Sequence, residues 1–148
     1  MKFQLLVLLF LLSQIGLADK FETPNDTLEA YLQACKEGDY QAAESCYTRS
    51  SRELAAQDAK QMGERPPELL IGTYERLKDV DFRLEQVNPK RAILWPETEQ
   101  IPPMFLRIQH AEEGWRLDYH FMSRYMRVNE NGWSWRNQRI LDLWKKRQ

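Results

Sequence analysis

This sequence has no large excess of either positive or negative charge. Among its 148 residues, 21 are lysine or arginine and 22 are aspartate or glutamate. A nearly neutral chain does not produce the broad positive field that a phosphate backbone requires, so we do not expect nucleic acid as a partner. The sequence also has no low-complexity tract, no long Gly/Ser linker and no convincing repeat. These absences favour a single domain over residues 19–148.

The motifs of several common enzyme classes are also missing. There is no Gly-rich phosphate loop, no Gly-x-Ser-x-Gly elbow, no His-Glu-x-x-His pair and no zinc-type cysteine spacing. The common hydrolase and metalloenzyme classes are therefore disfavoured, and we expect no metal and no cofactor. Catalysis by another arrangement of side chains stays open.

A long apolar run occurs only at the N-terminus. Lys2 supplies a positive start, residues 5–12 are all apolar, and Gly16-Leu17-Ala18 offers small residues for cleavage. The run is too short to span a bilayer as a helix, and its layout is that of a secretory signal peptide. We expect residues 1–18 to be a signal peptide and the mature chain to be periplasmic or secreted, without stable membrane insertion. An uncleaved N-terminal anchor is the alternative.

Cysteine is scarce, with Cys35 and Cys46 as its only occurrences. An even number of cysteines in an oxidising compartment favours a disulfide, so we expect these two residues to be bridged. Two buried free thiols are the alternative. A metal site is disfavoured because two thiols with no nearby histidine make a poor ligand set.

Helical periodicity dominates the first half of the mature chain. Thr23-Pro24 is typical of a helix start, and Gly38-Asp39 can end that helix and cap a second one. A third helix is expected to begin at Ser50 or Ser51 and run toward Gly63. A short fourth helix is expected over residues 69–77.

From Val80 onward the period changes to two, which predicts strands over residues 80–85 and 92–95. A hairpin is then expected between residues 104–110 and 115–121. The apolar pattern places His110 opposite Trp115, and the same register places Arg107 opposite Asp118.

A second hairpin is expected around Asn131-Gly132, where residues 125–128 would pair with residues 133–136. A short terminal helix through residues 140–144 would follow. Trp133 and Trp135 share one face of the predicted strand. That face is either core beneath the final helix or an exposed platform for a sugar or a protein.

Helices followed by antiparallel strands predict an α+β domain. The chain resembles the NTF2-like superfamily, which includes SnoaL-like and ketosteroid-isomerase-like proteins. The residues that carry the resemblance are Thr23-Pro24…Leu28…Tyr31-Leu32, Gly38-Asp39-Tyr40…Ala43 and Glu113-Gly114-Trp115-Arg116-Leu117-Asp118. The resemblance implies N-terminal helices packed on a strongly curved antiparallel sheet that leaves a conical cavity. Because dimers are common in folds of this type, it also leaves a homodimer open.

No catalytic motif of that superfamily matches residue for residue, so the candidate site residues come from the sequence itself. Tyr31, Tyr74 and Tyr119 place hydroxyl groups on apolar faces, and with Trp115 they are the candidates for ligand binding. His110 and Asp118 are the candidates for acid–base catalysis. The alternatives are packed core tyrosines, a structural histidine at a hairpin end, and an ion pair between Asp118 and Arg107.

These features predict an exported, non-catalytic NTF2-like domain that binds a small apolar ligand or an envelope protein. Two alternatives come from other classes. One is a small isomerase or hydrolase that uses Tyr, His or Asp in the cone. The other is an accessory module that binds cell-wall sugar or protein through exposed tryptophans, namely Trp133 and Trp135.

Overall fold

The computed structural model describes residues 20–147, so the predicted signal peptide lies outside the described residues. Four helices make up the first half: α2 (Pro24–Glu37), α3 (Tyr40–Ser45), α4 (Arg49–Met62) and α5 (Glu68–Leu77). Thr23 caps α2 in a capping box with Asp26, and Gly38 ends it in the left-handed conformation at φ 67°. The start of α2, its end at Gly38 and the Asp39 cap of α3 match the predicted ones. Helix α3 ends at Ser45, although the sequence predicts a helix that carries Tyr47, because Tyr47 forms a bridge with Leu117. Helix α4 begins earlier than predicted because Thr48, rather than Ser50 or Ser51, is its N-cap.

The second half is mainly antiparallel sheet. A four-stranded sheet contains β1 (Phe82–Asn88), β2 (Arg91–Pro96), β3 (Met104–Ile108) and β4 (Trp115–Leu117) in that order. Helix α6 (Tyr119–Tyr125) then leads into a separate two-stranded sheet of β5 (Met126–Asn129) and β6 (Gly132–Trp135), and α7 (Ile140–Lys146) follows. The predicted α+β class is confirmed.

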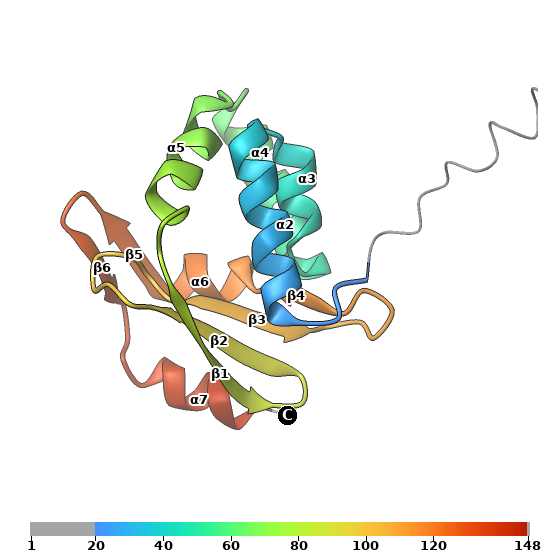
Figure 1. Ribbon diagram of the computed structural model, residues 1–148, viewed down its shortest axis with the longest axis vertical. Coiled ribbons are helices and arrows are strands. Elements are labelled where there is room, and N and C mark those ends of the chain that lie inside the picture. Colours follow the sequence, from blue (N-terminus) through green and yellow to red (C-terminus); the bar gives the residue numbers. More distant parts are fainter. Residues whose placement is uncertain (1–19, 148) are drawn as a thin grey trace, which may run out of the picture.

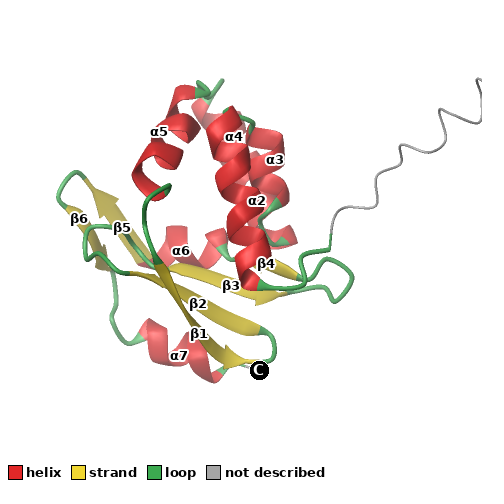
Figure 2. Cartoon of the chain, in the orientation of Figure 1, coloured by secondary structure: helices red, strands yellow, loops and turns green. Residues whose placement is uncertain are grey.

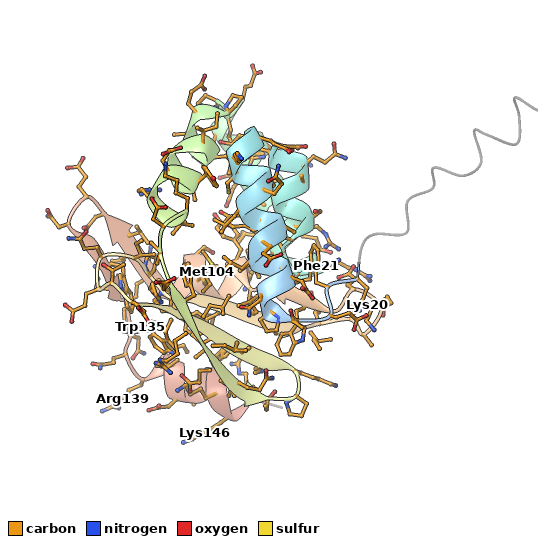
Figure 3. The ribbon with its side chains drawn as sticks, viewed as in Figure 1. Lys20, Phe21, Met104, Trp135, Arg139 and Lys146 are labelled. Carbon is orange, nitrogen blue, oxygen red and sulfur yellow. The ribbon has the colours of Figure 1, made fainter. Side chains whose placement is uncertain are left out.

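Helices cover both faces of the four-stranded sheet. Helices α2 to α5 lie on one face and α7 lies on the other, as Figures 1 and 2 show. Each face buries its own apolar cluster. Met104, labelled in Figure 3, belongs to the cluster on the α2 side, whereas Trp135 packs on the cluster that contains Phe105 and Trp144. Among residues 20–147, no helix combines the length and the apolar character needed to cross a membrane.

The first predicted hairpin forms, but its register is wrong. Ile108 pairs with Trp115 and Leu106 with Leu117, so residues 109–114 form a longer connection than expected. The return strand ends at Leu117 because Asp118 becomes the N-cap of α6, accepting a hydrogen bond from the backbone N–H of Phe121. The chain from residue 119 onward is therefore helical rather than extended.

The second predicted hairpin is confirmed. Met126 pairs with Trp135 and Val128 with Trp133, so the two tryptophans do share a face. Gly132 alone adopts a positive φ, 123°, at the start of β6. The predicted terminal helix is also confirmed as α7.

Two segments from the first half of the chain pair with β4. The Trp115 N–H donates to the Phe21 carbonyl (2.9 Å), and Phe21 forms a parallel bridge with Gly114. The Leu117 N–H donates to the Cys46 carbonyl (2.8 Å), while the Leu117 carbonyl accepts from the Thr48 N–H (3.0 Å). These contacts extend the sheet beyond its last strand.

The predicted Cys35–Cys46 disulfide is wrong for this structure, since both thiols are free and buried. The two helices direct the cysteines into different apolar clusters. Cys35 packs with Ala34, Ala43 and Leu70 among the helices, whereas Cys46 packs against the sheet.

Both thiols are expected to be nearly unreactive in the folded protein. Burial raises the pKa of Cys35, and it raises the pKa of Cys46 to about 11, so neither side chain is a thiolate at pH 8. A thiol-reactive dye should therefore label the native chain at least roughly tenfold more slowly than the denatured chain. Two thiols per chain should titrate after denaturation without reductant. Finding none would show that the disulfide forms after all.

Candidate functional site

A groove of about 970 Å³ lies on the surface of the protein. Its walls come from α5, α6, the β5–β6 hairpin and the loop before β3, and Tyr31 reaches it from α2. These elements are far apart in sequence, and the groove exists because the hairpin projects past the end of the main sheet toward α5 (Figure 1).

Most of the groove surface is apolar and adaptable. Three methionines contribute to it: Met104, Met122 and Met126. Methionine is unbranched and polarisable, so it can adjust to ligands of different shape. Leucine, isoleucine, valine and proline side chains complete the apolar part: Leu77, Ile101, Pro102, Pro103 and Val128.

A row of three tyrosines lies beside the groove, and two of them line it. The rings of Tyr47 and Tyr119 are stacked, with centroids 5.1 Å apart and planes 8° apart. The Tyr31 ring lies 6.2 Å from the Tyr47 ring. Tyr31 and Tyr119 line the groove, whereas Tyr47 lies between them and packs on the sheet core.

The phenols in this row remain protonated at neutral pH. Burial is the main cause that raises the pKa of Tyr31, and it also raises the pKa values of Tyr47 and Tyr119. Tyr47 and Cys35 raise the pKa of Tyr31 further. The hydroxyls of Tyr31 and Tyr119, the two that line the groove, can therefore donate hydrogen bonds to a ligand, but they are poor general bases.

Charged groups are few in the groove, and they lie at its rim. Arg76 donates to the Thr73 hydroxyl (3.5 Å) on the exposed side of α5. Glu130, in the turn of the hairpin, is the one carboxylate among the lining residues, and it is exposed. The lining contains no histidine.

The structure thus brings two of the four predicted ligand-binding residues together. Tyr31 and Tyr119 line the groove, but Tyr74 and Trp115 do not. Tyr74 packs among the helices near Leu70, with the Lys36 ammonium 5.9 Å from its ring centroid. Trp115 belongs to the sheet core.

The two candidate catalytic residues lie outside the groove. His110 lies in the connection between β3 and β4, where its carbonyl accepts the Glu113 N–H. Asp118 is buried and forms an ion pair with Arg107, whose Nε lies 3.1 Å from Asp118 Oδ2. The predicted contact between Asp118 and Arg107 is therefore present, although the two residues are not opposite each other in the sheet.

Trp133 and Trp135 are half-buried rather than fully exposed. Trp135 packs with its edge to Phe105, at a centroid distance of 5.7 Å, and Trp133 packs on Trp135 at 5.4 Å. Trp133 also lines a second, smaller groove of about 560 Å³ with Trp95. Ile101 and Pro103 belong to the walls of both grooves.

Sequence reasoning missed the methionines of the main groove. Met122 and Met126 lie four residues apart, in the middle of α6 and at the start of β5, but the predicted strand over residues 115–121 concealed that helix. Recognising Asp118 as a helix N-cap would have revealed it.

No group of three or more potential metal-ligating side chains occurs among residues 20–147. In comparisons with protein-family models, with curated proteins and with solved structures, nothing matches this chain.

Proposed function

We propose that this protein is an exported, non-catalytic NTF2-like domain that binds a small apolar ligand in the main groove. The observation that carries the proposal is the groove itself, with about 970 Å³ of space and a mostly apolar lining. This size falls at the upper end of the usual range for small-molecule sites, about 300–1,000 Å³.

The NTF2-like part of the proposal is supported by the order and layering of the elements. Helices α2 to α5 precede the antiparallel sheet and lie on one of its faces, which is where a cone would enclose a ligand. Export is supported by the pattern of residues 1–18.

The ligand class follows from the lining. A neutral apolar body would contact the methionines, while a carbonyl or hydroxyl oxygen could accept a hydrogen bond from Tyr31 or Tyr119. We propose binding rather than catalysis because the groove offers protonated phenols and one exposed carboxylate, without a buried acid–base pair.

The proposal can be tested by titrating residues 19–148 with the neutral fluorescent probe N-phenyl-1-naphthylamine. We expect saturable binding, and the Val128→Glu variant should bind about tenfold more weakly because it places a carboxylate in the apolar wall. Val128 is 59% exposed, so the substitution should leave the fold intact.

Leu84→Glu is the matched control. Leu84 is 42% exposed on β1 and does not line the groove, so this variant should bind the probe as the unaltered chain does. Equal weakening by both substitutions, or no saturable binding to the unaltered chain, would refute the proposal.

A further inference from the structure

Strand β1 is one edge of the four-stranded sheet, where it pairs with β2 and with no other strand among residues 20–147. Proline and lysine, which often prevent an edge strand from pairing with another chain, do not occur in it. Arg83, Leu84 and Gln86 are exposed along the strand. Its one irregularity lies beyond Gln86, so residues 82–86 form a regular run that a further strand can reach.

One hydrogen bond identifies the backbone groups that β1 directs away from β2. The Glu97 N–H donates to the Asp81 carbonyl (2.9 Å), and these two residues continue the β1–β2 register by one position. Hydrogen-bonded and non-hydrogen-bonded pairs alternate along antiparallel strands. The odd-numbered residues of β1 therefore bond to β2, whereas the even-numbered ones, Phe82, Leu84 and Gln86, direct their backbone N–H and C=O groups outward.

The side chains of β1 are divided between the two faces of the sheet. Leu84 is opposite Leu94 on the face that α2 to α5 cover, and it is 42% exposed there. Glu85 is opposite Ile93, whose side chain belongs to the apolar cluster on the α7 side. Arg83 lies on this second face too, because alternate residues of a strand point the same way. One face of the edge thus presents an apolar side chain and the other presents two opposite charges.

The negative charge of Glu85 is fixed in position. Its carboxylate accepts hydrogen bonds from the Lys145 ammonium (2.7 Å) and from the Trp95 indole N–H (2.6 Å). The hydrogen bond from Lys145 is the main cause that lowers the pKa of Glu85, and the charge of Arg83 lowers it further. Glu85 is therefore an ordered carboxylate at neutral pH, two residues from an exposed guanidinium.

We propose that two copies of this chain form a dimer in which β1 pairs antiparallel with β1 of the second copy, centred on Leu84. Leu84 is then opposite the same residue of the second copy, and Phe82 is opposite Gln86, so the outward backbone groups bond to one another. Arg83 of each copy is opposite Glu85 of the other, which is a favourable cross-strand pair. The interface is symmetric and joins the two sheets into one continuous sheet.

Backbone and charge select the same register. Shifting the pairing by one residue would place outward backbone groups opposite groups that already bond to β2. Shifting it by two residues restores the backbone match, but it places Arg83 opposite Arg83, or Glu85 opposite Glu85. Like charges directly opposite each other are destabilising. The edge is therefore complementary to itself, which is why we infer a second copy rather than an unrelated strand.

Sedimentation equilibrium of residues 19–148, from about 1 μM to about 1 mM, tests the proposal. The shared strand is short, so we expect a weak dimer with a Kd on the order of 10–100 μM. Arg83→Glu and Glu85→Lys should each weaken dimerisation at least about tenfold, because each places like charges opposite one another. An equimolar mixture of these two variants should dimerise again, since opposite charges then face each other across the interface.

Arg127→Glu is the matched control, because it makes the same change at an exposed arginine of β5. It should leave the Kd unchanged. A chain that stays monomeric up to about 1 mM would overturn the proposal, since it leaves no affinity of the expected size. A dimer that resists both β1 variants, or that Arg127→Glu weakens equally, would also overturn it.

Leu84→Pro provides a second test if Glu85→Lys does not fold. The Leu84 N–H points outward, so proline at this position removes a donor from the proposed interface and none from the pairing of β1 with β2. The variant should keep the circular dichroism spectrum of the unaltered chain and lose the dimer. A folded Leu84→Pro chain that dimerises as the unaltered chain does would refute pairing through β1. The interface is separate from the main groove, since no residue of β1 lines that groove.

Discussion

Replacing Asp118 with alanine is expected to destabilise the protein by about 3–5 kcal/mol, the usual cost of breaking a buried ion pair. Asp118 ends β4, caps α6 and pairs with Arg107, and it also accepts the indole N–H of Trp144. The substitution would leave each of these partners without its acceptor. Urea unfolding followed by circular dichroism measures the change in the free energy of unfolding.

Two further variants make the Asp118 experiment interpretable. Asp118→Asn keeps a side-chain oxygen for the α6 cap but removes the charge that Arg107 requires, so its effect should be smaller than that of alanine. Asp142→Ala alters an exposed aspartate in the first turn of α7 and should cost less than about 1 kcal/mol. An Asp118→Ala effect as small as that of Asp142→Ala would show that Asp118 does not join these elements.

Gly114→Ala should destabilise the protein by about 2–4 kcal/mol, combining backbone strain with a lost hydrogen bond. Gly114 has φ +70°, and a Cβ atom added there would lie 2.1 Å from the Phe21 carbonyl oxygen. The atom it would meet belongs to the backbone, so the chain at Phe21 would have to move. That movement would break the hydrogen bond between the Trp115 N–H and the Phe21 carbonyl. Thermal or urea unfolding measures the loss.

Gly63→Ala separates the two contributions to this effect. Gly63 also has a positive φ, +78°, but nothing lies within 4 Å of the position a Cβ would take. Its ψ is −158°, a combination that glycine almost alone adopts, so Gly63→Ala should show backbone strain without a clash, about 1–3 kcal/mol. If Gly114→Ala costs no more than Gly63→Ala, the contact with Phe21 does not constrain this position.

Local signals predicted most of the helices and one of the two hairpins. The capping box at Thr23 and the break at Gly38 depend on neighbouring residues, so the sequence alone places them. Asn131-Gly132 indicates the β5–β6 hairpin in the same way, but it leaves open whether the loop has two or four residues. The register, with Val128 opposite Trp133, is set by the fold. The register of β3 and β4 cannot be predicted from local signals, because an aspartate after alternating residues can continue a strand or cap a helix. Asp118 takes the second role.

The candidate site was less predictable because tertiary contacts select its residues. Tyr31, Tyr74 and Tyr119 carry the same signal, a hydroxyl on an apolar face, yet the fold turns Tyr74 toward the helices and the other two toward the groove.

The segments that pair with β4 have a consequence for how copies of this chain behave toward one another. An uncovered outer strand exposes backbone donors and acceptors that can recruit another chain and begin aggregation. Here the backbone around Phe21 and Cys46 to Thr48 occupies those positions. Among residues 20–147, self-association by strand addition is thereby blocked at the β4 side, which leaves β1 as the other edge strand of the four-stranded sheet.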